Sequence, residues 1–106
     1  MLNLFVSANT DGDVEIRAKG KLRYAESTTV ANCLNSLIRV HKRVVINLAE
    51  LDAIDAAGIG VLAAAYQRGL GQGTAVSLSR VPGRVRELLE LARLGHLLSN
   101  QAAAAA

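Results

Sequence analysis

Apolar residues recur with a period of two at Leu2, Leu4 and Val6, and apolar and polar residues alternate over residues 14–19, which predicts two strands. The stretch 9–13 between them is dense in turn-forming residues and contains Gly12. Two alternating runs around such a turn predict an antiparallel hairpin. We expect Gly20 to end this hairpin, and we expect the hairpin to form one edge of a sheet.

Three later segments carry apolar residues at spacings of three and four, which is typical of one buried helical stripe. The first begins near residues 26–29, the second follows Gly58, and the third begins at Pro82, since proline is well tolerated in the first turn. Their apolar positions are Val30, Cys33, Leu34, Leu37 and Ile38, then Ile59, Leu62, Ala63, Tyr66 and Leu70, and then Val85, Leu88, Leu89 and Ala92. Glycines within 69–73 are expected to end the second helix, and Gly95 the third.

Two further segments predict strands between and after these helices. Residues 44–48 form a continuous, largely β-branched run, which suits a central strand covered on both faces. Residues 75–78 predict a short strand, and the stretch with Glu50 and Asp52 is expected to be a loop. The order β-β-α-β-α-β-α implies an α/β fold with right-handed crossovers. We expect a small mixed, mostly parallel β-sheet with an N-terminal hairpin edge and helices packed mainly on one face.

The composition fits one domain over residues 1–100, followed by an Ala-rich tail over residues 101–106. The chain is 51% hydrophobic but only 3% aromatic, so its core must be aliphatic. No apolar run reaches the roughly 20 residues of a membrane helix, and the N-terminus lacks the basic start of a secretory signal. A cytoplasmic protein with no direct membrane insertion is expected. The single cysteine, Cys33, is expected to be a core residue, because a reactive thiol needs exposure and a positive environment.

The formal charge of +3 is only mildly basic. The densest basic cluster consists of Arg80, Arg84, Arg86 and Arg93. No aromatic residue lies among these arginines to stack on bases, so nucleic-acid binding is not expected. The cluster is either a solvated helix face or a contact for an acidic partner. His41 is expected to complement a helix dipole, and neither it nor His96 has the spacing of a catalytic or metal site.

The turn Asp55-Ala56-Ala57-Gly58 leads from a loop into the second helix and is the main candidate site. Asp55 is expected to cap the helix, because a carboxylate there accepts backbone N–H bonds and complements the dipole. This role is favoured over that of a general base. A hydroxyl group at either of the next two positions could take part in a chemical step, but Ala56 and Ala57 have none. We therefore expect no catalytic residue, and the chain is not expected to be an enzyme.

A dinucleotide-binding protein is a remote alternative. The run from Gly58 to Ala63 matches the G-x-G-x-x-A pattern, and Arg80 stands where an arginine could contact NADP. However, residues 49–57 separate this pattern from its strand, and the chain has no room for a second half. No cofactor and no metal are therefore expected.

The element order and two motifs resemble the STAS domain family, named for sulphate transporters and anti-sigma factor antagonists. One motif is the turn over residues 54–62, which reads Ile-Asp-x-x-Gly-x-Gly-Val-Leu, and the other is the leucine-rich helix over residues 84–94. The resemblance covers roughly residues 2–98 and is closest to the small single-domain bacterial anti-sigma factor antagonists. It implies the fold expected above and a protein-interaction module that regulates transcription by partner switching.

In the antagonists of this family, a serine follows the aspartate of the turn, and a kinase that is also the anti-sigma factor phosphorylates it. This chain has Ala56 there, which cannot be phosphorylated. The family often has Gly-Glu-Leu-Asp after the second strand, whereas residues 20–23 read Gly-Lys-Leu-Arg, so the partner should carry acids. These departures favour natural divergence of the sequence over an engineered serine-to-alanine substitution that would lock the switch. The resemblance implies a partner-docking loop, with a degenerate phosphorylation site, made of Asp55, Ala56, Ala57, Gly58, Gly60 and Arg23.

Two functions remain open under this resemblance. The first is an anti-sigma factor antagonist-like module that binds an anti-sigma factor or a related kinase-like regulator. It would stay binding-competent, or be regulated by expression or at another hydroxyl group, the candidates being Thr28, Thr29, Ser77 and Ser79. The alternative is an accessory STAS subunit of an ABC lipid transporter, which binds the transporter ATPase and needs no phosphoryl switch. The exposed first strand could also pair with a second copy to form a homodimer.

Overall fold

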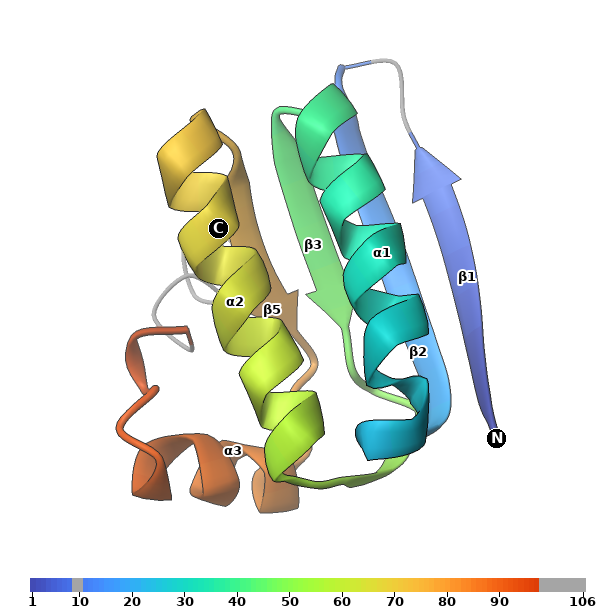
Figure 1. Cartoon of the computed structure of the whole chain (residues 1–106), viewed down its shortest axis with the longest axis vertical. Helices are drawn as coiled ribbons and strands as arrows, with labels where there is room; N and C mark the ends of the chain where they lie inside the picture. The colour runs from blue at the N-terminus through green and yellow to red at the C-terminus, as the bar shows by residue number, and fades with distance from the viewer. Residues whose placement is uncertain (9–10, 98–106) are drawn as a thin grey trace.

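The structure of the chain is a computed structural model that describes residues 1–8 and 11–97. The described residues form one five-stranded sheet and three helices (Figure 1). The elements are β1 (Leu2–Ala8), β2 (Asp13–Leu22), α1 (Tyr24–Val40), β3 (Arg43–Asn47), β4 (Leu51–Ile54), α2 (Ala56–Gln72), β5 (Ala75–Ser79) and α3 (Gly83–Leu91). The predicted tail over residues 101–106 lies outside the described residues.

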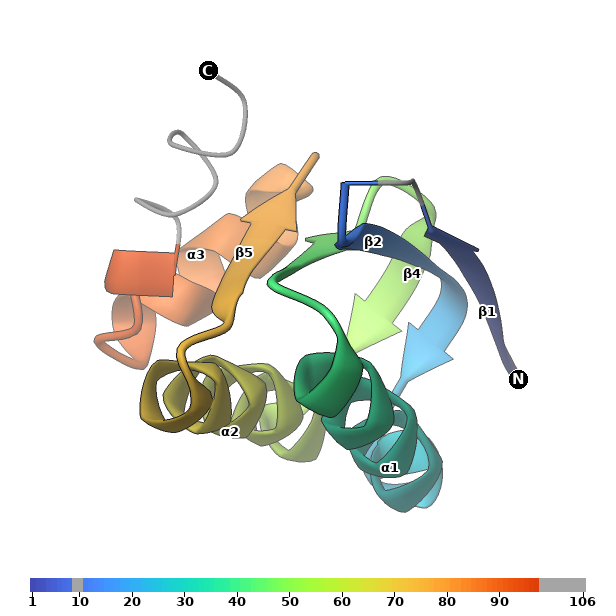
Figure 2. The same ribbon diagram turned by 90° about the horizontal axis from the view of Figure 1, so that it is seen from above.

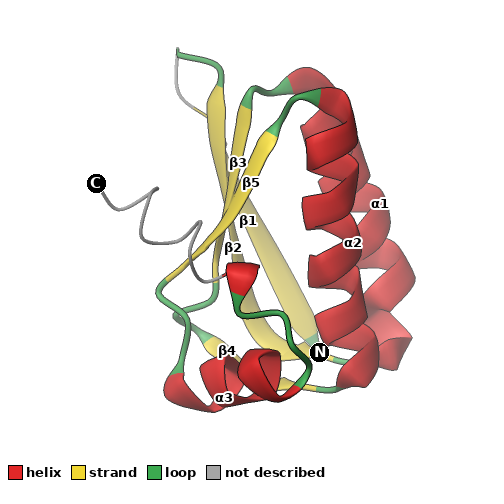
Figure 3. Ribbon diagram, turned by 90° about the vertical axis from the view of Figure 1, so that its left-hand side faces the viewer, coloured by secondary structure: helices red, strands yellow, loops and turns green. Residues whose placement is uncertain are grey.

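The sheet is mixed and mostly parallel. Its strands follow the order β1-β2-β3-β5, and β4 pairs with the end of β2 that β3 does not reach. The hairpin β1–β2 is antiparallel and forms one edge, whereas the other pairings are parallel. Seen from above, α1 and α2 lie side by side along one face of the sheet (Figure 2). α3 lies at the end of the sheet where α2 begins (Figure 3). The predicted fold class is confirmed.

The second strand is longer than its sequence pattern predicts. We expected Gly20 to end it, but β2 continues to Leu22. Gly20 has a φ of +117°, and a Cβ atom there would collide with the carbonyl oxygen of Met1. The pairing register with β4 shifts between Gly20 and Lys21. Gly20 therefore lies at an irregularity inside the strand, where only a residue without a side chain fits.

The strand β4 was predicted to be a loop, and that prediction was wrong. It pairs with the last part of β2, with Gly20 opposite Leu51 and Leu22 opposite Ile54. Leu51 is buried, and the backbone N–H of Asp55 donates to the carbonyl oxygen of Leu22. A four-residue strand has too few positions for a periodic signal, so long-range pairing decides its conformation. This pairing carries the chain directly to the start of α2.

The core is aliphatic, as the composition predicts, and the stripe predicted for α1 is confirmed. α1 buries Val30, Leu34 and Ile38, and Cys33 and Leu37 pack partly buried against them. Burial raises the pKa of the Cys33 thiol above its ordinary value, which leaves less of the reactive thiolate. The expected role of this cysteine as a packing residue is therefore supported.

The buried face of α2 differs from the predicted one. It consists of Gly58, Ile59, Leu62, Ala65 and Gly69. Leu70 was predicted to be part of the stripe but is 60% exposed. A Cβ atom on Gly69 would lie 2.6 Å from the carbonyl oxygen of Thr74 and from Cγ2 of Val76. The missing side chain lets α2 approach β5 closely there, so the neighbouring Leu70 turns to solvent.

The helix ends also correct several predictions. α1 begins at Tyr24, before the predicted start at 26–29. α2 ends at Gln72 and is capped by Gly73, whose φ is +75°, so the predicted end at the glycines within 69–73 is confirmed. Pro82 is the residue before α3 rather than its first residue. α3 ends at Leu91 instead of reaching Gly95. A glycine therefore marks the end of α2 but not that of α3.

Candidate functional site

The carboxylate of Asp55 holds the turn at the start of α2 in place. Its Oδ1 accepts a hydrogen bond of 2.9 Å from the backbone N–H of Gly58, and its Oδ2 accepts one of 3.0 Å from that of Tyr24. The predicted cap is confirmed, and the same side chain also binds the first residue of α1. One carboxylate thus links the N-termini of two helices, where negative charge is stabilised.

These hydrogen bonds, first that of Gly58 and then that of Tyr24, hold the pKa of the Asp55 carboxyl below its ordinary value. A group with a lowered folded-state pKa stabilises the fold above its unfolded pKa, which is about 3.9 for aspartate. That contribution is lost as the pH falls through the lower, folded-state pKa.

We predict that Asp55→Asn destabilises the domain most at neutral pH. Below the folded-state pKa, wild type and variant should have nearly equal free energies of unfolding, because both side chains are then neutral. Urea unfolding at pH 7, 5 and 3 measures this difference. Asp52→Asn, at an exposed position of β4, controls for removing a nearby surface charge. A deficit of Asp55→Asn that stays constant from pH 7 to pH 3 would contradict the prediction.

The two glycines of the turn have different surroundings. A Cβ atom on Gly58 would lie 2.5 Å from the carbonyl oxygen of Leu22 and 2.7 Å from Cγ1 of Ile54. By contrast, no atom lies within 4 Å of the position that a Cβ atom on Gly60 would take. Gly58 therefore belongs to the packing of α2 on β2 and β4, whereas Gly60 leaves open space on the surface.

An apolar groove of about 480 Å³ lies between the start of α2 and α3. Its lining consists of Ile54, Asp55, Ala56, Ile59, Gly60, Leu88, Leu91 and Ala92. Leu88 is 37% exposed and Leu91 is 81% exposed. The structure therefore brings the predicted residues Asp55, Ala56 and Gly60 together with leucines of α3. We call this feature the α2–α3 groove.

The leucines of α3 are the site residues that the sequence reasoning missed. Leu88 was assigned to the buried stripe, but only Val85 and Leu89 of this helix are buried. A signal was present, because Val85, Leu88, Leu89 and Leu91 cover more of the helix circumference than one buried stripe needs. The surplus apolar arc forms the wall of the groove.

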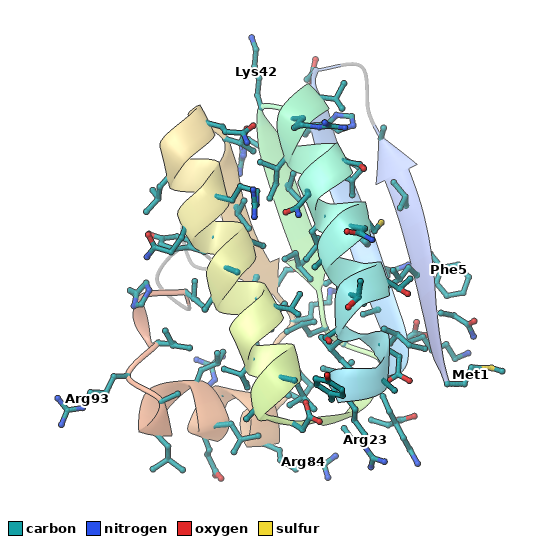
Figure 4. The ribbon with its side chains drawn as sticks, in the orientation of Figure 1. Met1, Phe5, Arg23, Lys42, Arg84 and Arg93 are labelled. Atoms are coloured by element: carbon teal, nitrogen blue, oxygen red, sulfur yellow. The ribbon has the colours of Figure 1, made fainter. Side chains whose placement is uncertain are left out.

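The predicted arginine cluster does not form one patch. Figure 4 shows Arg23 and Arg84 at the same lower end of the molecule, whereas Arg93 points outward on the other side of α3. The Arg84 side chain donates a hydrogen bond of 2.9 Å to the carbonyl oxygen of Asp52. The backbone N–H of Arg23 donates a hydrogen bond of 3.2 Å to the Glu26 carboxylate. Arg23 is exposed and precedes Tyr24, whose N–H is bound by Asp55 of the turn.

The glycine pattern of the remote dinucleotide alternative does not have the required geometry. Gly58 and Gly60 both lie inside α2, whereas a dinucleotide site places its glycines in the turn before the helix. Within residues 1–8 and 11–97, no group of three or more His, Cys, Asp or Glu side chains is arranged to hold a metal ion. Over the same residues, the helices are too short or too polar to cross a membrane.

A family model described as "Mlab, STAS domain" matches residues 6–99. The chain belongs to the STAS domain family. The match covers every described element from the middle of β1 onward, including the turn and α3. No curated protein matches the chain significantly.

Solved structures of several relatives share the fold of this STAS domain. The unphosphorylated anti-sigma factor antagonist SpoIIAA of Bacillus is 15% identical, with a TM-score of 0.72 over 84% of this chain and 83% of that one. An antagonist from Mycobacterium paratuberculosis is 18% identical, with a TM-score of 0.80 over 91% and 81%. A sulfate transporter family protein from Wolinella succinogenes is 18% identical, with a TM-score of 0.73 over 86% and 75%.

The STAS domain carries no hydroxyl group on the two residues that follow its capping aspartate. Ala56 is the exposed first residue of α2, and Ala57 is half-buried behind it. The other candidate hydroxyl groups lie elsewhere: Thr28 and Thr29 are exposed on α1, whereas Ser77 and the Oγ atom of Ser79 are buried in β5. The turn thus keeps its cap and its close packing without a side chain that could accept a phosphoryl group.

Proposed function

We propose that this STAS domain is a non-enzymatic protein-interaction module of the anti-sigma factor antagonist type, which binds its partner without phosphoryl switching. The partner is an anti-sigma factor or a related kinase-like regulator in the cytoplasm, and the effect is on transcription. The observation that carries the proposal is the exposed methyl group of Ala56 at the first position of α2. The docking residues are Arg23, Asp55, Ala56, Ala57 and Gly60, with Gly58 packed beneath them.

The physical reason is the charge that this position would otherwise acquire. A phosphate carries about −1.5 to −2 charges at pH 7. At the N-terminus of α2 it would be tolerated by the domain itself, but beside Asp55 in a docking surface it would repel an acidic partner. Because Ala56 cannot take this charge, the docking surface stays in one state. Control then lies in how much of the domain is made or in the partner.

The test uses the kinase-type anti-sigma factor encoded in the same genome, mixed with the purified domain and ATP. Wild type should form a stable complex and gain no phosphate by mass spectrometry, because Ala56 has no acceptor. Ala56→Ser should regain the switch: it should be phosphorylated and should then leave the complex. A wild-type domain that is phosphorylated and released, or that forms no complex, would contradict the proposal.

A second candidate is an accessory subunit of an ABC lipid transporter. The specific observation in its favour is the matching family model, whose description names Mlab. A subunit that only clamps an ATPase needs no phosphoryl acceptor, so Ala56 fits this function as well. Co-expression with the transporter ATPase of the same genome separates the two, because an accessory subunit should co-purify with the ATPase in fixed stoichiometry whatever the state of ATP.

A further inference from the structure

We propose that the α2–α3 groove receives an amphipathic helix of the partner, whose apolar face fills the groove and whose acidic end meets Arg23 and Arg84. This inference rests on the proposed function and specifies the chemistry of the partner. Three properties of the groove support it: its apolar lining, the small residues along one wall, and the charge at one end.

The two walls of the groove offer different kinds of contact. On α3, Leu88 and Leu91 expose branched side chains toward the groove. On α2, the lining positions Ala56 and Gly60 are both exposed and lie four residues apart, so they share one helix face. Small side chains let a second helix approach this face closely, while the leucines supply apolar contact area. An amphipathic helix with anchors at spacings of three and four fits such a groove.

The size of the groove suits the side chains of such a helix. About 480 Å³ holds several aliphatic side chains, because a pocket of roughly 300–1,000 Å³ accommodates a drug-sized apolar group. A second hollow adjoins it between β4 and α3, and Ile54 and Leu88 line both. Arg84 and Asp52 line this second hollow, and Arg23 lies at the same end of the molecule (Figure 4), so the apolar path leads from Leu91 toward a charged end.

The charge at that end favours an acidic occupant. Neither Arg23 nor Arg84 forms an ion pair with another residue in the described part of the chain. α3 also has no acidic residue in its first turn and no side-chain cap, so the positive end of its dipole adds to Arg84. Three carboxylates also lie at this end: Asp52 lines the second hollow, whereas Asp55 and Glu26 already accept backbone N–H bonds at helix N-termini. Carboxylates on the partner would therefore gain attraction at this end.

Two glycines of α2 allow a matched test of the groove. Gly60 and Gly71 both lie in α2, both are exposed, and neither has an atom within 4 Å of the position of an added Cβ. Glutamine at either position should improve helix propensity by a similar amount. Only the side chain at position 60 would occupy the groove, because Gly71 lies 11 residues, about three turns, further along the helix.

The experiment titrates a synthetic helical peptide of about 18 residues into the domain and follows amide chemical shifts by NMR. The peptide has leucines at helical spacings of three and four and two glutamates in its first turn, and a matched peptide has lysines in their place. Wild type should bind the glutamate peptide about tenfold more tightly than the lysine peptide. Gly60→Gln should weaken binding by about tenfold or more, and Gly71→Gln should bind as wild type does. The double variant Arg23→Gln, Arg84→Gln should lose the preference for glutamate.

The results separate this inference from the proposed function. Absence of peptide binding, equal binding of the two peptides, or equal effects of Gly60→Gln and Gly71→Gln would overturn the groove proposal. If the anti-sigma factor binds wild type and both glycine variants equally well, the groove proposal fails while the proposed function stands. If the peptide behaves as expected but the domain binds no anti-sigma factor, the groove stands and the proposed function fails.

Discussion

Replacing Gly58 by alanine is expected to lower the free energy of unfolding by about 3 kcal/mol, which is typical of an extra methyl group forced into a packed site. The new Cβ atom would meet the carbonyl oxygen of Leu22 at 2.5 Å and Cγ1 of Ile54 at 2.7 Å. The first of these is a backbone atom of the last residue of β2, which is paired with β4, and it cannot rotate away. Relief requires α2 to shift away from β2 and β4, which also strains the hydrogen bond between the Gly58 N–H and Asp55.

Gly60→Ala is the matched control, since it makes the same chemical change two residues further along the same helix. Nothing lies within 4 Å of its added Cβ, so alanine should raise the free energy of unfolding by up to about 1 kcal/mol through its higher helix propensity. Urea unfolding followed by circular dichroism measures both variants. A change of the same sign at the two positions would show that helix propensity, and not close packing, governs this turn.

These two glycines also show what the sequence could predict about the site. Both belong to one motif, and the motif correctly places a capped helix start at Asp55, because capping depends on residues close together in the chain. The motif does not tell which glycine is packed and which is open. That difference arises from β2 and β4, and β4 was predicted to be a loop. Its conformation depends on pairing with a strand some 30 residues earlier in the chain, which no local pattern encodes.

The same reasoning applies to the helices. The stripe of α1 was predicted correctly because one face of this helix, with Val30, Leu34 and Ile38, is buried in the core. In α2 the prediction was wrong at Leu70, since the close approach of Gly69 to β5 turns the neighbouring side chain outward. In α3 the apolar arc was assigned to a single buried face, whereas part of it lines the groove. Helical periodicity predicts that a helix has an apolar face, but it does not predict which part of the protein, if any, covers that face.

The likeness to the solved antagonists and the absence of a phosphoryl acceptor bear on different questions. The fold rests on packing residues such as Gly58, Leu34 and Leu62, and it survives at 15–18% identity to the relatives compared above. The proposed regulatory behaviour depends on one side chain at the start of α2, where this STAS domain has the methyl group of Ala56. The likeness to these structures therefore shows the fold alone, and the proposal of a surface that is not switched by phosphorylation depends on Ala56.

Leu89→Ala is expected to lower the free energy of unfolding by about 3 kcal/mol, within the usual range for a buried leucine. Leu89 is fully buried, with 0% of its surface exposed, and with Val85 it forms the buried face of α3. Removal of its side chain leaves a cavity beneath a helix of only nine residues, which has little stability of its own. Urea unfolding of wild type and variant measures the loss.

Leu91→Ala is the matched control in the same helix, because it removes the same atoms from a side chain that is 81% exposed. Its free energy of unfolding should stay within about 0.5 kcal/mol of wild type. Binding of the glutamate peptide should nevertheless weaken, since Leu91 lines the groove. Leu89→Ala should lose stability first and binding as a consequence, because the wall that carries Leu91 is no longer anchored. If the two variants unfold at the same urea concentration, α3 is not held by Leu89 and the groove has no fixed wall.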